Sequence, residues 1–130
     1  MIEFHLEDHS GLSPYLQIVR QVRQALRLGL LAEGDQLPTV KEVVARLAIN
    51  PNTVLKAYRE LEHEGLVAAR PGVGTFATAT LTDGSLAAHG PLRMDLQRWL
   101  AKARKAGLDD ESIEALFMTT FRTVAGEEIA

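Results

Sequence analysis

Cysteine is absent from this chain of 130 residues. Disulfide bonds, cysteine-based zinc sites and thiol nucleophiles are therefore excluded, and the absence agrees with a reducing compartment. Aromatic residues are scarce, and no hydrophobic run approaches the roughly 20 residues that a membrane-spanning helix needs. The segment from Met1 to Asp8 carries acidic residues where a signal peptide has positive charge, so we expect a cytoplasmic protein without a membrane partner.

The chain has fewer basic residues than acidic ones, 14 compared with 17, which gives a net charge of −3. This balance argues mildly against nucleic acid as a partner. The distribution along the chain points the other way. Between Val43 and Arg59 there are basic residues and no acidic ones, and Glu60, Glu62 and Glu64 follow at once. A locally basic segment therefore lies within an acidic chain.

Apolar residues recur every three or four positions after Pro14, which predicts an amphipathic helix over residues 14–28. Pro14 suits its first turn and Gly29 suits its C-terminal exit. The next residues predict a turn and a short extended piece, because Pro38 keeps Leu37 out of the helical region.

Two short helices separated by a tight turn are predicted next. Residues 39–42 form a capping box, which starts a helix over about residues 39–47. Asn50 suits the N-cap and Pro51 the first position of a third helix, over about residues 51–64. This is a helix-turn-helix arrangement.

Residues 66–78 read as two short strands joined by a glycine-rich turn. A hairpin directly after a helix-turn-helix is a wing. We therefore predict a winged helix-turn-helix domain over residues 1–79 and a linker over residues 80–90, which are rich in small residues.

Residues 91–130 predict two further helices in a hairpin. About 40 residues are too few to bury a core alone, so their apolar faces need a partner surface. Either the first domain or the same hairpin of a second chain could supply it, and two-fold pairing is the commoner solution. The fold class is thus mainly α with a small β-wing, ending in a two-helix dimerisation hairpin. The expected dimerisation residues are Leu92, Leu96, Trp99, Leu100, Ile113, Leu116, Phe117 and Phe121.

Several ordered motifs resemble the winged helix-turn-helix of GntR-type bacterial transcriptional regulators, over roughly residues 12–78. The short helical tail resembles that of the YtrA subfamily, in which the tail serves dimerisation. The motifs that carry the resemblance are Pro14-Tyr15-Leu16-Gln17-Ile18, Gly34 to Glu42, Asn50 to Val54, Ala57 to Glu62, Gly65-Leu66-Val67 and Gly72 to Phe76.

The resemblance implies where DNA is contacted. Relatives commonly have arginine at the position of Lys41, and lysine lacks the fork that reads guanine, which favours a phosphate contact. Relatives often have arginine at Pro51 too, so direct contacts are expected to shift to its neighbours. In relatives the glycine matching Gly72 approaches the minor groove. The expected DNA-binding residues are Lys41, Asn50, Pro51, Asn52, Thr53, Lys56, Arg59, Arg70, Gly72 and Gly74.

Simpler structural roles stand beside these contacts. Asn50 caps a helix whatever else it does, and Gly72 and Gly74 permit the hairpin turn without any DNA. The aromatic rings of Tyr15 and Tyr58 lie in apolar stripes and are expected to pack. The arginines at 46, 59 and 70 could instead pair with the glutamates at 42, 60 and 62 on a solvated surface.

The function expected from these patterns is a dimeric repressor that binds double-stranded DNA at an inverted repeat, with half-sites about one helical turn apart. Two other readings stay open: a winged helix that binds a protein, and a ligand sensor or enzyme subunit without DNA binding. A small-molecule effector of unknown identity is compatible with each. The histidines lack metal spacing and no phosphate loop or activated nucleophile is visible, so we expect no metal, no cofactor and no enzymatic activity.

Overall fold

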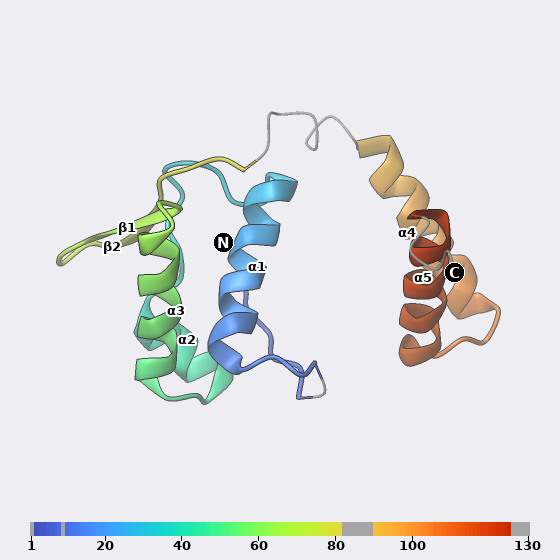
Figure 1. The fold of residues 1–130 in the computed structure, drawn as a ribbon, viewed down its shortest axis with the longest axis horizontal. Helices are drawn as coiled ribbons and strands as arrows, with labels where there is room; N and C mark the ends of the chain where they lie inside the picture. Colours follow the sequence, from blue (N-terminus) through green and yellow to red (C-terminus); the bar gives the residue numbers. More distant parts are fainter. Residues whose placement is uncertain (1, 9, 82–89, 126–130) are drawn as a thin grey trace. The chain divides into compact units, whose positions relative to one another are not determined.

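The protein is described by a computed structural model over residues 2–8, 10–81 and 90–125 (Figure 1). The chain divides into two compact units, Met1–Ala88 and His89–Ala130. Most of the predicted linker lies outside the described residues. The elements are α1 (Pro14–Leu28), α2 (Val40–Leu47), α3 (Pro51–His63), β1 (Val67–Arg70), β2 (Gly74–Ala77), α4 (Gly90–Lys105) and α5 (Asp110–Ala125).

Local signals in the sequence set the ends of the first three helices. Thr39 and Glu42 form the predicted capping box at α2, each side chain accepting a hydrogen bond from the other's backbone N–H at 3.1 Å. At α3 the Asn50 side chain accepts from the N–H of Asn52 at 2.8 Å. Gly29 ends α1 with φ 74°, a left-handed conformation that glycine adopts without strain. The predicted helix bounds are confirmed.

The wing is a small antiparallel sheet in which Val67 lies opposite Ala77. The extended piece before α2 also joins it, because Gln36 bridges to Phe76 and the N–H of Leu37 donates to the carbonyl of Thr75 at 2.8 Å. The sequence predicted the extended piece but not this pairing. As a result β2 lies between two partners, and the start of α2 is tied to the wing.

The core of the first unit joins α1, α2, α3 and the base of the wing. Helices α1 and α3 run side by side in the same direction (Figure 1). Tyr58 is buried, as predicted, and its hydroxyl donates to the carbonyl of Pro38 just before α2. The buried core residues are Phe4, Ile18, Val19, Val22, Ala25, Leu26, Leu31, Leu37, Val43, Val54, Ala57, Tyr58, Leu61, Leu66, Val67 and Ala77.

The N-terminal residues form an extended segment that docks on α1 through two glutamine side chains. Gln21 accepts from the N–H of His5 at 3.1 Å and donates to its carbonyl at 2.7 Å. Gln17 does the same for Glu7, at 2.8 Å and 3.1 Å. Gln17 and Gln21 lie one helical turn apart, and this distance matches the spacing of alternate residues in an extended chain. Their side chains therefore form the hydrogen bonds that the backbone of a neighbouring strand would form. The segment thereby places Phe4 in the core, with its ring centroid 6.5 Å from that of Tyr58.

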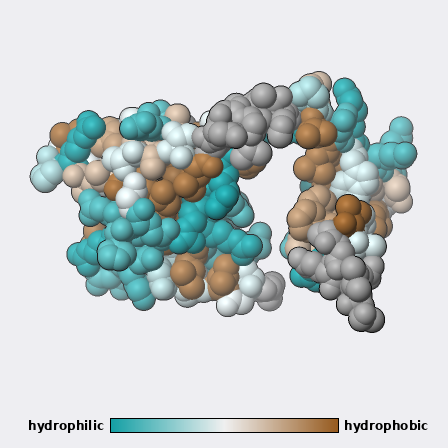
Figure 2. Space-filling model, turned by 45° about the horizontal axis from the view of Figure 1, so that its top comes forward, coloured by the Kyte–Doolittle hydropathy of each residue, from teal (hydrophilic) through white to brown (hydrophobic). Residues whose placement is uncertain are grey.

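The second unit is the predicted pair of helices, with Asp109 capping α5 by accepting from the N–H of Ser112. Ile113 requires a correction, because it is buried within the hairpin and holds the two helices together instead of facing outward. Trp99 and Leu100 are half-buried, and the other five expected dimerisation residues are exposed. Hydrophobic residues are visible on this unit in Figure 2. Among the described helices, none is long and apolar enough to cross a membrane.

Candidate nucleic-acid interface

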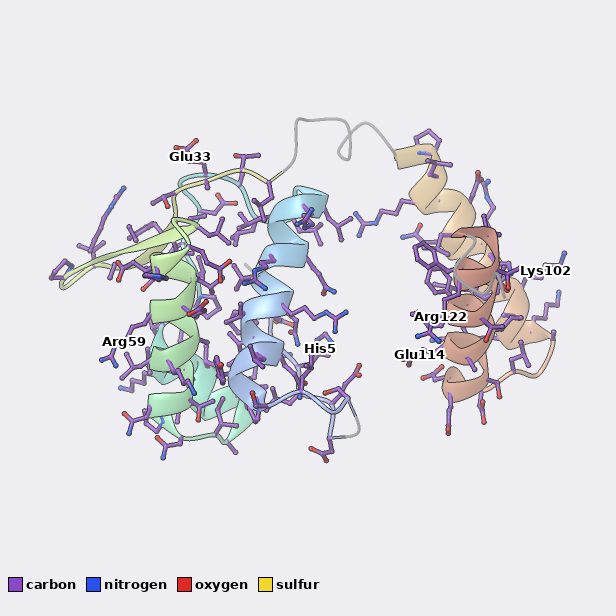
Figure 3. All side chains as sticks on the ribbon, viewed as in Figure 1. His5, Glu33, Arg59, Lys102, Glu114 and Arg122 are labelled. Atoms are coloured by element: carbon purple, nitrogen blue, oxygen red, sulfur yellow. The ribbon has the colours of Figure 1, made fainter. Side chains whose placement is uncertain are left out.

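Helix α3 presents a polar outer face, which we define by Asn52, Lys56 and Arg59. All three side chains are exposed, and the helical spacing places them opposite the buried stripe that includes Val54 and Leu61. The labelled Arg59 side chain projects away from α1 in Figure 3. His63 continues this face by one more turn. His63 was not among the expected DNA-binding residues, although its spacing of four from Arg59 signals the shared face.

The first turn of α3 is open to a ligand. Asn50 uses its side-chain oxygen to cap the helix, and its backbone carbonyl accepts from the N–H of Thr53 at 3.0 Å. Pro51 is exposed and has no N–H to donate, while Thr53 is half-buried. Asn52 is exposed and its backbone N–H is used by the cap, which leaves its side-chain amide available to a partner.

Four of the expected basic residues keep their charge at the surface. Within the described ranges Lys41, Lys56, Arg59 and Arg70 form no ion pair, whereas Arg46 pairs with Glu3 at 3.1 Å. The sequence left open that the arginines pair with the glutamates at 42, 60 and 62, and for Arg46 that alternative is wrong. Its partner comes from the N-terminal segment, which local charge spacing cannot reveal.

Nearby glutamates are occupied by other contacts. A side-chain oxygen of Glu42 accepts from the N–H of Thr39, and one of Glu62 accepts from the N–H of Ala69 at 3.0 Å. Glu64 forms a two-point contact with Arg23, and this hydrogen bonding raises the pKa of Arg23 and lowers the pKa of Glu64. Glu42, Glu62 and Glu64 thus serve the fold, and none of them forms an ion pair with Lys41, Lys56, Arg59 or Arg70 among the described residues.

Two of the free cations rest on aromatic rings. The Lys56 ammonium lies 3.9 Å from the centroid of the Tyr15 ring, and the Arg70 guanidinium carbon lies 4.5 Å from that of Phe76. Tyr15 therefore packs as predicted and also holds a cation. Such contacts orient a flexible basic side chain without neutralising its charge.

The wing turn depends on two glycines in conformations that other residues rarely adopt. Gly72 has φ 76° and is exposed, and Gly74 has φ 145°. A Cβ at Gly74 would meet the amide of Gln36, which donates to the carbonyl of Val73 at 3.3 Å. Gln36 thus fastens the tip of the wing to the segment before α2, a role that the sequence analysis missed.

Burial raises the pKa of the Tyr58 hydroxyl far above its usual range, so that hydroxyl remains protonated and keeps donating to Pro38. This bond joins α3 to the start of α2, where Lys41 lies. No group of three or more potential metal-ligating side chains was found in the part of the chain that the structure describes. The outer face of α3, the start of α2 and the wing thus present exposed basic side chains that an anionic partner could contact.

Comparison with known proteins agrees with this geometry. The family described as bacterial regulatory proteins, gntR family, matches residues 14–77. The HTH-type transcriptional repressor YtrA of Bacillus subtilis is 33% identical over 83% of this chain and 84% of its own. The HTH-type transcriptional regulator Rv1152 of Mycobacterium tuberculosis is 41% identical over 71% and 72%, respectively.

A solved structure extends the likeness to the fold. YtrA from Sulfolobus acidocaldarius, a GntR-family transcription factor, has a TM-score of 0.55 at 28% identity, covering 75% of this chain and 97% of that one. The relatives are regulators and not enzymes. The chain therefore belongs to the GntR family and is a transcriptional regulator of the YtrA type, with a winged helix-turn-helix as its DNA-binding domain.

Proposed function

We propose that this protein is a homodimeric repressor that binds an inverted-repeat operator in the cytoplasm. Helix α3 enters the major groove, and the wing, residues 66–78, lies on the adjacent backbone or in the minor groove. A two-fold dimer presents two such helices on one side of the duplex, so the half-sites lie about 10 base pairs apart, centre to centre. Occupancy of a promoter by the dimer excludes the polymerase.

One observation carries the DNA-binding part of this proposal: Lys41, Lys56, Arg59 and Arg70 are exposed on α2, α3 and the wing and form no ion pair with the described residues. Phosphate contacts from a few such residues supply affinity even when the whole chain is acidic, because distant charges are screened over about 8 to 10 Å. The net charge of −3 therefore does not oppose DNA binding.

The outer face of α3 supports base reading. Asn52 has a free amide that can donate to and accept from adenine in the major groove. Lys56 and Arg59 flank it, and the uncovered first turn adds the positive end of the helix dipole. Lys41 at the start of α2 suits a phosphate beside the groove.

The wing supports a second contact at each half-site. Arg70 is exposed at the end of β1, and Gly72 gives the turn a surface without a side chain, which permits close approach to the sugar-phosphate backbone. Both lie at the end of the hairpin that Gln36 fastens. The wing therefore acts as a rigid arm in this proposal.

Dimerisation is supported by an apolar groove of about 340 Å³ on the helical hairpin. Phe121 is 57% exposed and Leu116 is 45% exposed, a large apolar surface for two helices that bury little of their own. A second copy covers this groove by two-fold pairing. The groove is lined by Leu96, Trp99, Leu116, Phe117, Thr120, Phe121 and Val124.

The test is selection of bound duplexes from a random DNA pool by the purified protein, at two salt concentrations. We expect an enriched inverted repeat whose affinity falls steeply with salt, since phosphate contacts release counterions. The outcome that would contradict the proposal is no enrichment by a folded dimer, which would instead favour a protein partner for the winged helix.

A pair of matched variants tests the surface assigned to DNA. Arg59→Ala should weaken operator binding, whereas Arg122→Ala removes the same charge from an exposed position on α5 and should not (Figure 3). Equal losses from the two variants would show that only overall charge matters, and would remove α3 from the interface.

A further inference from the structure

The ammonium group of Lys56 is held by a residue from another helix. It lies 3.9 Å from the centroid of the Tyr15 ring, which is half-buried in the first turn of α1. Helices α1 and α3 run in the same direction, so their N-terminal turns lie at the same end of the domain (Figure 1). Neither first turn contains an acidic residue. The ammonium therefore lies on the first turn of α1, at the end of the domain that carries the N-terminal turns of both helices.

We infer that Tyr15 is a positioning residue for DNA binding, which holds the Lys56 ammonium at the α1 edge of the outer face of α3, ready for a backbone phosphate. This inference rests on the proposed function. It gives Tyr15 a role in DNA binding in addition to its packing in the fold. The ring leaves the far side of the ammonium open, because Lys56 is exposed.

The physical basis is the flexibility of lysine. Its side chain has four rotatable bonds, and ordering them opposes any contact that the ammonium makes. A cation–π contact at an exposed site favours one arrangement about two- to fivefold. If the arrangement that binds phosphate is the one already populated, the affinity for DNA rises by the same factor.

The position of the ring also decides which part of DNA Lys56 contacts. Asn52 lies one turn earlier and near the middle of the outer face, whereas Tyr15 draws the ammonium toward α1. Lys56 is therefore directed to the phosphate backbone beside the groove instead of a base edge. Loss of either residue should weaken binding by a similar factor at every base sequence.

The experiment is a double-mutant cycle with the full chain, the selected operator and fluorescence anisotropy at several salt concentrations. Tyr15→Leu keeps an apolar side chain but removes the ring, and should weaken binding about two- to fivefold. Tyr15→Phe keeps the ring face and should bind like the natural protein. Lys56→Ala should lower the salt slope by about one. In the Lys56→Ala background, Tyr15→Leu should have no further effect.

Two results would overturn the inference while leaving the proposed function intact. One is an undiminished effect of Tyr15→Leu when Lys56 is alanine, which would mean that the ring acts through the fold. The other is unchanged operator binding by Tyr15→Leu. If the folded natural protein binds no DNA at all, the proposed function and this inference fail together. Circular dichroism spectra of the variants separate unfolding from lost positioning.

Discussion

Asn50, the N-cap of α3, and Asn52, in its first turn, are two asparagines with different uses. The Asn50 side chain is engaged in the helix cap, whereas the side chain of Asn52 is exposed. Removal of a cap costs about 1 kcal/mol of folding free energy, and removal of a base reader costs specificity. The same substitution at the two positions should therefore affect different measurements.

Asn52→Ala should reduce operator affinity by about 1 to 3 kcal/mol and relax the preference for one base pair in each half-site. Its thermal stability should stay near that of the natural protein. Asn50→Ala is the matched comparison, and it should lower the unfolding free energy. Competition assays with singly substituted operators and thermal melting measure the two effects. Retained discrimination in Asn52→Ala would remove this residue from base reading.

Ala48 ends α2 in a left-handed conformation with φ 54°, the one non-glycine residue with positive φ among the described residues. A Cβ is disfavoured there, so Ala48→Gly should stabilise the domain by about 0.5 to 1 kcal/mol. Ala45→Gly, three residues earlier in an exposed helical position, should destabilise it by about 1 kcal/mol. Chemical denaturation of both variants checks the opposite signs.

Residues with local signals could be placed from the sequence, and residues that depend on a distant partner could not. Thr39 and Glu42 predict a helix start, because both hydrogen bonds of the capping box join residues within one stretch of four. Arg46 forms an ion pair with Glu3, which lies 43 positions away in the sequence, and Lys56 contacts the ring of Tyr15 on another helix. Spacing along one element carries no information about such pairs, so the outer face of α3 was predictable and these two contacts were not.

The wing is the element whose attachment matters most to its proposed role. Its tip is held by the Gln36 side chain at the carbonyl of Val73. Gln36→Ala should loosen the tip at a cost of up to about 1 kcal/mol, the usual net value of one hydrogen bond, and should weaken operator binding by a similar amount. Gln24→Ala, at an exposed position on α1, is the control. Amide exchange at Val73 should accelerate in the first variant alone, and an unchanged rate would show that the tether is not holding the tip.

The ion pair between α1 and the end of α3 makes stability depend on pH. The Arg23 contact lowers the pKa of Glu64 below its ordinary value of 4.5, so the folded state resists protonation of this carboxylate. Its contribution is complete above pH 4.5 and is lost as the pH falls through the lowered pKa. We expect the loss to be at most about 1 kcal/mol, because the pair is partly exposed.

Glu64→Gln should flatten the stability profile in that acidic window, as measured by denaturation at a series of pH values. Glu33→Gln removes a carboxylate that forms no ion pair with the described residues, and should leave the slope in place. A slope that survives Glu64→Gln would assign the acid sensitivity to another group.

At the scale of elements, periodicity and turn signals predicted the five helices and both wing strands of the described residues. It did not predict the third partner of the sheet or the docking of the N-terminal segment, since pairing is a property of two segments. The sequence does contain a signal for the docked N-terminal segment, because Ile2, Phe4 and Leu6 alternate with Glu3 and His5. That period of two is typical of an extended chain with one face buried.

For the whole molecule, the proposal depends on whether two chains join through the helical hairpin. Phe121→Asp places a charge in the apolar groove, where an unpaired buried carboxylate is strongly unfavourable. We expect a monomer in analytical ultracentrifugation, and operator affinity at least a hundredfold weaker, because the two half-sites are then bound separately. Both rings pack against Phe117, and Phe121 suits this test because its side chain is more exposed than that of Trp99.

Thr119→Asp adds the same charge to an exposed position of α5 outside the groove and should remain dimeric. A dimer that persists in Phe121→Asp would place the dimer contact on another surface. The sequence predicted that the hairpin needs a partner, but it could not separate Ile113, which is buried within the hairpin, from the residues that stay exposed.

The docking of the N-terminal segment bears on how this family can diverge. Gln17 and Gln21 bond to the backbone of His5 and Glu7 and not to their side chains, so this docking does not depend on the identities of those two side chains. Proline is the exception, because it lacks the N–H that each glutamine accepts. We expect the evolutionary constraint on the segment to fall instead on Phe4, on Ile2, which also packs against the core, and on the glutamines themselves, so that homologues can keep the docked segment while varying the residues between.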